Sequence, residues 1–296
     1  MNLAKQRAKK HHYVPQVLQR RFNADNGKIW YAEKDKITGL FAKAEERNTS
    51  SCFMLRDYYT ISEANKLSDK VETTFYGEID SYLGDLLPNL VASLDSNSFP
   101  TFTAEAFESL KSVLYHLLTR TPDFVSTFDD IEAGQEIIEK TVSALKREGK
   151  DHDAIAEEQK LHNSSLLKKL GREARVRGQI KKPEEFTSLM SDFEVFWIKA
   201  PDKHRYILGS RIAYIIGNGG PNGISNPKSE IWFPISSRYC MVVMRPNGGI
   251  NQLSRDSPKR VKALNLYIAR NCSQIGGHSN ELITSIANKS NKLEQA

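Results

Sequence analysis

The chain has 296 residues, of which 39% are apolar and 26% are charged, and it carries a formal net charge of +6. A chain of this length and composition can bury a full hydrophobic core, so we do not expect a globally disordered protein. No apolar run approaches the ~20 residues that span a bilayer, so we expect no membrane protein, and the mild positive excess is compatible with a polyanionic partner without requiring one.

The chain opens with a basic segment, residues 1–10, which we predict to be a basic arm. No apolar segment follows it, so it does not have the pattern of a secretory signal. Val14 and Pro15 favour an extended backbone, because the residue before a proline avoids the helical region. A short helix is expected at Gln16–Phe22, since proline suits the first helical turn.

Short strands are expected in the next part of the chain. Lys28–Ala32 is rich in strand-forming residues, and Thr38–Phe41 is predicted to return as its hairpin partner. Leu55–Ile61 is predicted to be a further strand.

Two amphipathic helices follow these strands. Apolar residues recur at helical spacing from Asp69 to about Leu87, and this helix is expected to end before Pro88. Thr103 is predicted to cap a second helix, which ends near Arg120.

The second half of the chain begins with a charged segment at 125–190, which is predicted to be a helical insertion of two or three helices. A closing helix is expected after Pro258, followed by a frayed tail at 288–296. The whole chain, 1–296, is therefore expected to be a single α+β domain with helices packed on small antiparallel strands. The strands of its C-terminal part are predicted at 193–198, 206–208, 211–216, 230–233 and 238–244.

The three cysteines, Cys52, Cys240 and Cys272, are widely spaced and odd in number. This pattern favours neither a disulfide framework nor a cysteine zinc site. We expect reduced, mostly buried thiols and a cytoplasmic location.

A block near the N-terminus carries a family resemblance. His11-His12-Tyr13-Val14-Pro15-Gln16, followed by Arg21 and Phe22, resembles the opening of the domain of unknown function 4238 family, in which two histidines precede an aromatic residue and a Val-Pro pair. The resemblance implies an organisation and no activity, because the family has no settled one. Looser landmarks extend over nearly the whole chain: Val71-Glu72, Ile79-Asp80, Arg120-Thr121-Pro122, Ile207-Leu208-Gly209-Ser210 and Phe233-Pro234-Ile235-Ser236.

The chain departs from this family pattern at one place. Where the pattern has Ser-Asp-x-Pro, this sequence has Ser210-Arg211-Ile212-Ala213. If the aspartate is a ligand or base in other members, either it is absent here or another acid, such as Asp192 or Asp202, takes its place.

The adjacent residues His11 and His12 are the first candidate catalytic residues. Histidine titrates near neutral pH and is a common metal ligand. The context is similar to that of His-metal finger nucleases, although those sites need a further histidine or acid after a short helix, and the next histidine here is His116. Neighbours in an extended segment point to opposite faces. We therefore expect one histidine to work alone and the other to pack as structure, and a divalent metal stays open as a cofactor.

Two acids on the first predicted helix are the second set of candidates. Glu72 and Asp80 lie eight residues apart, which places them within about 80° of one face of an α-helix. Glu72 is expected to reach and orient one of the histidines. The alternative is that both acids are solvated on the helix edge.

Basic residues supply candidates for binding a polyanion. Arg120 is a candidate anion clamp, with the alternative that it only complements the dipole of its helix. The stretches Lys5–Lys10 and Lys168–Lys182 are also basic, and they could follow a phosphate backbone or be solvated helix faces.

The leading hypothesis is therefore a nuclease-like hydrolase acting on nucleic acid. His11 or His12 would be the base, with Glu72 and Asp80 as the assisting acids. Arg21, Arg120 and Ser210 would bind the substrate. The alternative is a non-catalytic module that binds nucleic acid or protein, in which the His-Pro segment is structural.

Overall fold

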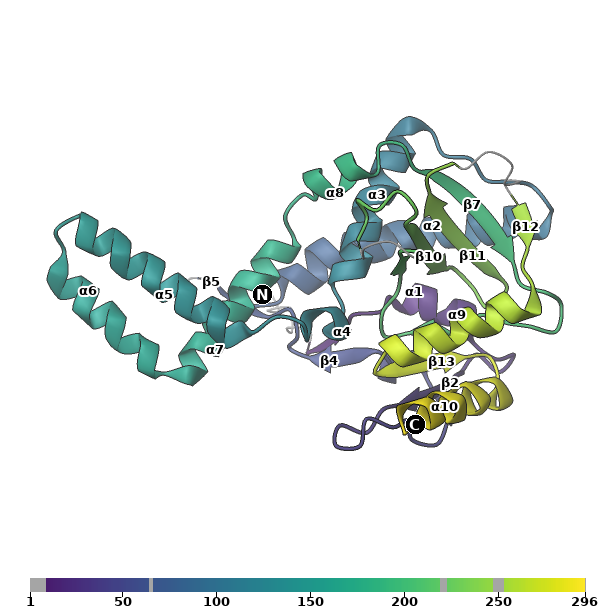
Figure 1. The fold of residues 1–296 in the computed structure, drawn as a ribbon, viewed down its shortest axis with the longest axis horizontal. Coiled ribbons are helices and arrows are strands. Elements are labelled where there is room, and N and C mark those ends of the chain that lie inside the picture. Colours follow the sequence, from purple (N-terminus) through teal and green to yellow (C-terminus); the bar gives the residue numbers. More distant parts are fainter. Residues whose placement is uncertain (1–8, 64–65, 219–222, 247–252, 296) are drawn as a thin grey trace, which may run out of the picture.

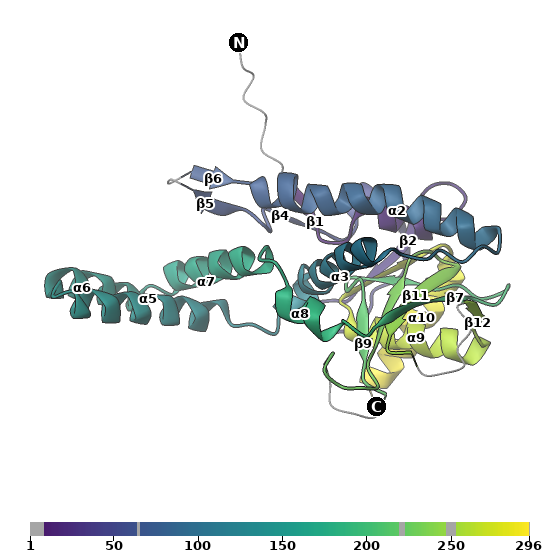
Figure 2. The ribbon, with the colours of Figure 1, turned by 90° about the horizontal axis from the view of Figure 1, so that it is seen from above.

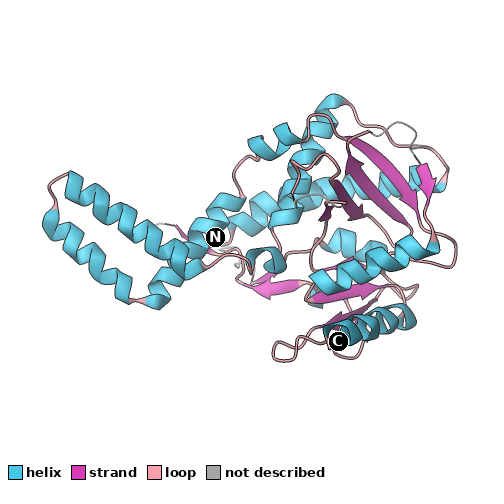
Figure 3. Ribbon diagram, viewed as in Figure 1, coloured by secondary structure: helices cyan, strands magenta, loops and turns pink. Residues whose placement is uncertain are grey.

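The computed structural model describes residues 9–63, 66–218, 223–246 and 253–295 (Figure 1). Helices packed on small, mostly antiparallel sheets confirm the predicted α+β class (Figure 3). Most of the predicted basic arm, residues 1–8, lies outside the described residues. Among the helices of the described ranges, none has the length and apolar content needed to cross a membrane.

The larger sheet has the strand order β12-β7-β11-β10-β9. Its inner strands pair antiparallel, and only β12 runs parallel to its neighbour β7. Every residue of β11 is buried, so both faces of the sheet are covered at this strand. The strands are β7 (Glu194–Lys199), β9 (Tyr214–Ile216), β10 (Glu230–Pro234), β11 (Tyr239–Met244) and β12 (Leu253–Arg255).

The second sheet joins the two ends of the chain. Its order is β3-β2-β13-β8, so the late strand β13 lies between two strands that come much earlier in the sequence. The helices α9 (Pro258–Asn271) and α10 (Asn280–Glu294) pack against β13. The strands are β2 (Ile29–Glu33), β3 (Glu45–Arg47), β8 (Leu208–Gly209) and β13 (Gln274–Gly277).

The end of the chain corrects a prediction. Residues 288–294, which were expected to fray, continue helix α10 as far as Glu294. Asn291 explains the difference, because its side-chain amide accepts from the Phe41 N–H at 2.8 Å and donates to the Phe41 carbonyl at 3.0 Å. This pair of hydrogen bonds ties the last turns of the helix to a distant loop.

The same loop corrects the predicted hairpin. Thr38–Phe41 forms only an isolated bridge from Phe41 to Lys34, and the antiparallel partner of β2 is β3. The predicted strand Leu55–Ile61 is divided in two, because Asp57 adopts a positive φ of 52° that turns the chain. The resulting two-stranded sheets pair β1 (Lys10–His12) with β4 (Met54–Arg56), and β5 (Ile61–Glu63) with β6 (Lys66–Ser68).

The two predicted amphipathic helices lie beside one another on the body (Figure 2). The first begins with the π-helical turn η3 (Val71–Tyr76) and continues as α2 (Gly77–Asp95). It does not end before Pro88 as predicted, because the buried Leu90 and Leu94 extend the same apolar face. The packing of these leucines outweighs the cost of about 3 kcal/mol for an interior proline.

The second helix, α3 (Ala104–Thr119), begins at its predicted cap. The Thr103 hydroxyl accepts from the Ala106 N–H at 3.2 Å. Short helical segments complete the body: α1 (Gln16–Gln19), η1 (Arg20–Phe22), η2 (Thr49–Ser51), α4 (Pro122–Val125) and α8 (Glu184–Leu189).

The remaining helices project from the body as an arm (Figure 1, Figure 2). The arm has its own small apolar cluster, centred on Ile138 and Leu167, which is separate from the main core. Its helices fall within the segment 125–190: α5 (Asp130–Arg147), α6 (Asp151–Glu158), η4 (Gln159–His162) and α7 (Ser164–Gln179).

Two glycines allow the arm helices to touch, and they yield a stability prediction. A Cβ at Gly171 would lie 1.8 Å from the Asp130 carbonyl oxygen, and one at Gly134 would lie 2.1 Å from that of Leu167. Because the obstacle is backbone, Gly171→Ala is expected to destabilise the arm by about 1–3 kcal/mol. Hydrogen exchange of the α5 and α7 amides measures this loss.

The matched control is Gly178→Ala in the same helix. A Cβ there meets no atom within 4 Å, so alanine is expected to stabilise α7 by up to about 1 kcal/mol. Equal protection of the arm amides in both variants would contradict the packing argument.

Candidate functional site

The two adjacent histidines lie on β1 and face opposite sides, as their alternation predicts. His11 is fully buried, and its Nδ1 accepts the backbone N–H of Tyr59 at 2.9 Å. The two rings stack at 5.8 Å with an interplanar angle of 10°. An Nδ1 that accepts a hydrogen bond leaves the proton of a neutral imidazole on Nε2. His11 therefore packs as part of the interior.

His12 faces the beginning of the long helix and is only partly buried. Its backbone N–H donates to Glu72 Oε1 at 3.2 Å, and its Nδ1 lies 3.4 Å from the Gln16 side-chain amide nitrogen. Its Nε2 is buried, and it makes no hydrogen bond of acceptable geometry with the described residues. Burial lowers the pKa of His12, although the Ser50 backbone and the Asp80 carboxylate act to raise it. The ring is therefore neutral at physiological pH.

The π-helical turn η3 aligns the two predicted acids. In a regular α-helix each residue rotates by about 100°, which leaves Glu72 and Asp80 about 80° apart. The wider π turn holds more residues per turn, so each rotates less and the offset between the two acids shrinks. Single π turns within helices are frequent at functional sites. The sequence spacing predicted that Glu72 and Asp80 share one face of the helix, and the π turn brings the two directions closer together.

Arg120 joins the three elements of the cluster. Its guanidinium is fully buried, donates from Nη1 to Asp80 Oδ1 at 2.8 Å, and donates from Nη2 to the His12 carbonyl at 2.7 Å. The guanidinium carbon also lies 4.2 Å from the centre of the Tyr76 ring, over its face. The Arg120 carbonyl in turn accepts the Tyr59 hydroxyl at 2.6 Å. Both terminal nitrogens of Arg120, which was predicted as an anion clamp, thus donate within the protein, while its buried Nε has no partner among the described residues.

Glu72 has the most unusual carboxyl group of the cluster. Burial, assisted by the Asp80 carboxylate, raises its pKa to about 7, although Arg120 and the His12 N–H act to lower it. Its Oε1 accepts the His12 N–H, while its Oε2 is buried without a partner among the described residues. A carboxyl that titrates near neutral pH can exchange a proton with a substrate. We refer to His12, Glu72, Asp80 and Arg120 as the β1 cluster.

The other predicted site residues lie outside this cluster. Arg21 is in η1, where its carbonyl accepts the Ser237 N–H at 3.1 Å. Ser210 is fully buried, hydrogen-bonds the Asp123 carboxylate, and accepts the Gln274 N–H at 3.1 Å. The acid that meets Ser210 is thus Asp123, whereas Asp192 pairs with Arg245 at 2.8 Å.

The predicted basic stripe on α7 is largely engaged within the protein. Arg172 donates to the Thr60 carbonyl and Arg177 to the Ser62 carbonyl, each at 3.0 Å. Arg175 pairs with Asp130 at 3.0 Å. These arginines hold the β5 segment and α5 against α7. The lysines of the stretch, Lys168, Lys169, Lys181 and Lys182, are exposed.

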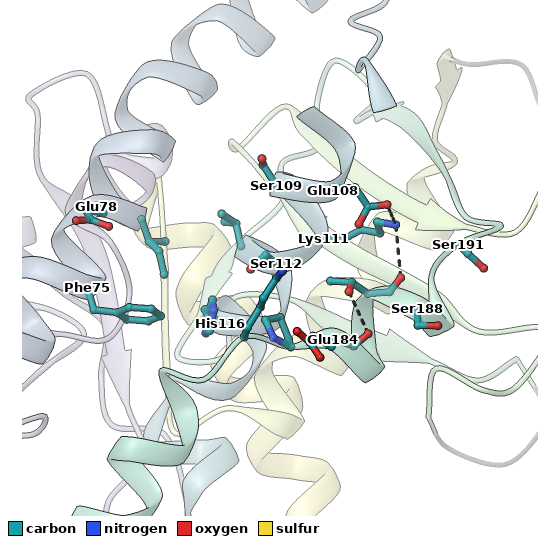
Figure 4. A pocket seen from close by; sticks show the side chains of 15 residues that line it. Phe75, Glu78, Glu108, Ser109, Lys111, Ser112, His116, Glu184, Ser188 and Ser191 are labelled. Carbon is teal, nitrogen blue, oxygen red and sulfur yellow. Dashed lines mark hydrogen bonds and ion pairs between the residues drawn. The ribbon is translucent and has the colours of Figure 1, made fainter. Parts of the chain in front are cut away.

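A large pocket that the sequence did not suggest lies between η3, α2, α3 and α8 (Figure 4). It measures about 790 Å³, and its lining includes Phe75, Glu78 and His116. Burial lowers the pKa of His116 to about 4, and its Nδ1 has no partner in the described part of the chain. Lys111, almost fully buried, pairs with Glu108 at its rim. The helical periodicity placed Phe75 and Ile79 on an apolar face and gave no signal that part of this face lines a pocket.

The donor groups for a metal are sparse. Within residues 9–63, 66–218, 223–246 and 253–295, no three histidine, cysteine, aspartate or glutamate side chains stand together in a way that could hold a metal ion. All three cysteines are free and buried. The ionisable side chains of the β1 cluster can carry out proton transfer.

Comparisons with known proteins give one match. Residues 10–275 match the family model described as Protein of unknown function (DUF4238). No curated protein and no solved structure matches the chain.

Proposed function

The chain belongs to the DUF4238 family, and we propose that it is a nuclease-like hydrolase in which His12 is the general base and Glu72 the general acid. The observation that carries the proposal is the opposite displacement of two neighbouring pKa values. Burial holds the pKa of His12 below 6.5 and raises that of Glu72 to about 7. Between these values the dominant state has a neutral imidazole and a protonated carboxyl, which are the forms that accept and donate a proton.

The chemistry follows from the acceptor nitrogen of His12 and the carboxyl group of Glu72. The Gln16 amide nitrogen faces His12 Nδ1, so the neutral ring carries its proton on Nε2 and takes up the proton of the attacking hydroxyl or water on Nδ1. The Glu72 carboxyl proton passes to the leaving oxygen of the phosphodiester. His12 is partly buried and Glu72 Oε2 is buried, so the reaction requires a covering segment to move aside; η2 is the candidate, because the Ser50 backbone faces the His12 ring. Asp80 and Arg120 are positioning residues, since Arg120 fixes the His12 peptide and Asp80 fixes Arg120.

A nucleic-acid substrate is supported by charge. The chain carries a formal charge of +6, and the exposed Lys10 directly precedes the two histidines. Lys10 is close enough to act on the pKa of His12, and it can contact a phosphate beside the cluster. The free thiols suit a reducing cytoplasm, which we propose as the location.

The test is direct incubation of the full chain with RNA and with single-stranded DNA, each with and without a divalent metal. Wild type is expected to cleave one of them, and His12→Ala to lower the rate by at least tenfold, because general base catalysis contributes this much or more. His152→Ala, an exposed histidine of the arm, is the matched control and is expected to cleave as wild type. No cleavage by wild type under any condition, or unchanged cleavage by His12→Ala, would contradict the proposal.

The alternative is a non-catalytic binding module. The full burial of His11 and Arg120 favours this alternative. Buried in this way, the N-terminal His-Pro segment contributes to the core whether or not it also forms a site. Binding of nucleic acid without cleavage, measured in the same mixtures by a mobility shift, would favour this alternative.

A further inference from the structure

A second, smaller hollow lies among α3, α4, α8, β9 and α9, and none of the β1 cluster residues lines it. Its volume is about 320 Å³, which lies at the small end of the range of ligand pockets. The elements that form it are far apart in the sequence. A pocket assembled in this way is a property of the tertiary fold, and the sequence pattern gave no sign of it.

Two pairs of aromatic side chains line this hollow. Tyr115 and Phe186 lie with ring centres 5.3 Å apart. Tyr214 and Tyr267 meet edge to face, at 6.1 Å and 79°. Aromatic faces and edges attract planar rings at these separations. These side chains therefore suit a flat, aromatic ligand.

A single charged side chain, Arg211, lines the hollow among the residues that form it. Its Nη2 donates to the Asp123 backbone carbonyl at 2.7 Å, which orients the guanidinium without neutralising it. The Asp123 carboxylate is occupied by Ser210 and by the Ser273 N–H. The Arg211 Nε is buried and has no partner in the described ranges. An anionic group in the hollow would accept charge-assisted hydrogen bonds from the free donors of the Arg211 guanidinium.

We propose that this hollow binds a small planar aromatic anion, with its ring against the aromatic side chains that line it and its anionic group on Arg211. This site is separate from the proposed catalytic cluster. Two sources share the required chemistry, a nucleoside monophosphate and an aromatic carboxylate.

Isothermal titration of the full chain with adenosine monophosphate and with indole-3-carboxylate tests the proposal. At least one anion is expected to bind with a Kd below about 1 mM, and the tighter of the two identifies the source. Adenosine and indole, which lack the anionic group, are expected to bind at least about tenfold more weakly. Binding of neither anion, or equal binding of the neutral compounds, overturns the proposal.

Matched variants locate the binding. Arg211→Gln is expected to weaken anion binding by at least about tenfold, and Arg211→Lys by less, since the charge remains. Tyr267 is 39% exposed, so Tyr267→Ala removes one lining side chain without creating a large cavity in the core. This variant is expected to weaken anion binding, while Tyr267→Phe is expected to retain it. His12→Ala is expected to bind as wild type, which separates this site from the proposed activity. Unchanged affinity in both Arg211→Gln and Tyr267→Ala overturns the proposal.

Discussion

Replacing Arg120 with methionine is expected to lower the free energy of unfolding by about 3–5 kcal/mol, because it leaves buried partners without their donor. The His12 carbonyl would lose its hydrogen bond, Asp80 would lose its ion pair, and the Tyr76 ring would lose the cation over its face. Methionine retains most of the volume, so the loss reports the polar contacts more than a cavity. Urea denaturation of the full chain measures it.

The control for this experiment is an exposed arginine with a similar ion pair. Arg238 lies 3.0 Å from Asp95, but both side chains are nearly half exposed. Arg238→Met is expected to cost at most about 1 kcal/mol, since exposed pairs contribute little. Comparable losses in the two variants would show that Arg120 does not hold β1, α2 and α3 together.

The sequence predicted local structure well where it depends on the two-residue repeat of a strand, the helical repeat or a single capping residue. Alternation along an extended segment separated His11 from His12, and a single polar residue, Thr103, located the start of a helix. Helical spacing brought Glu72 and Asp80 towards one face. In each case residues close in the chain determine the outcome, so local backbone preferences suffice.

Contacts between segments far apart in the sequence could not be predicted from these local repeats. β13 contains two glycines and has no strand-like composition, but it pairs with β2, and a Cβ at Gly276 would lie 2.7 Å from Ile29 Cδ1 of that strand. The Ser210–Asp123 contact joins residues far apart in the chain, and the acids named from the sequence as replacements were Asp192 and Asp202. The role of Arg120 was missed for the same reason, since its partners lie on β1 and α2.

The burial of Glu72 predicts a dependence of stability on pH that does not require any enzymatic activity. Its pKa is about 7 in the folded chain and about 4.5 in the unfolded chain, so the folded state binds the proton more tightly. The stabilisation is complete below pH 4.5 and is lost as the pH rises through 7. At 1.36 kcal/mol for each pKa unit, the loss is about 3 kcal/mol. His12 acts in the opposite direction, because its lowered pKa favours the folded state above pH 6.5.

Glu72→Gln isolates this contribution, since glutamine keeps the shape of the carboxylic acid and cannot ionise. The difference in unfolding free energy between the variant and wild type is expected to grow by about 3 kcal/mol in favour of the variant between pH 4.5 and 8. Denaturation curves at several pH values measure it, with Glu78→Gln, an exposed acid six residues further along the helix, as the control. A difference that stays constant with pH would show that the Glu72 carboxyl is ionised in the folded chain throughout this range. Such a carboxylate would have no proton to give to a leaving group, so this outcome would also remove the general acid from the proposed mechanism.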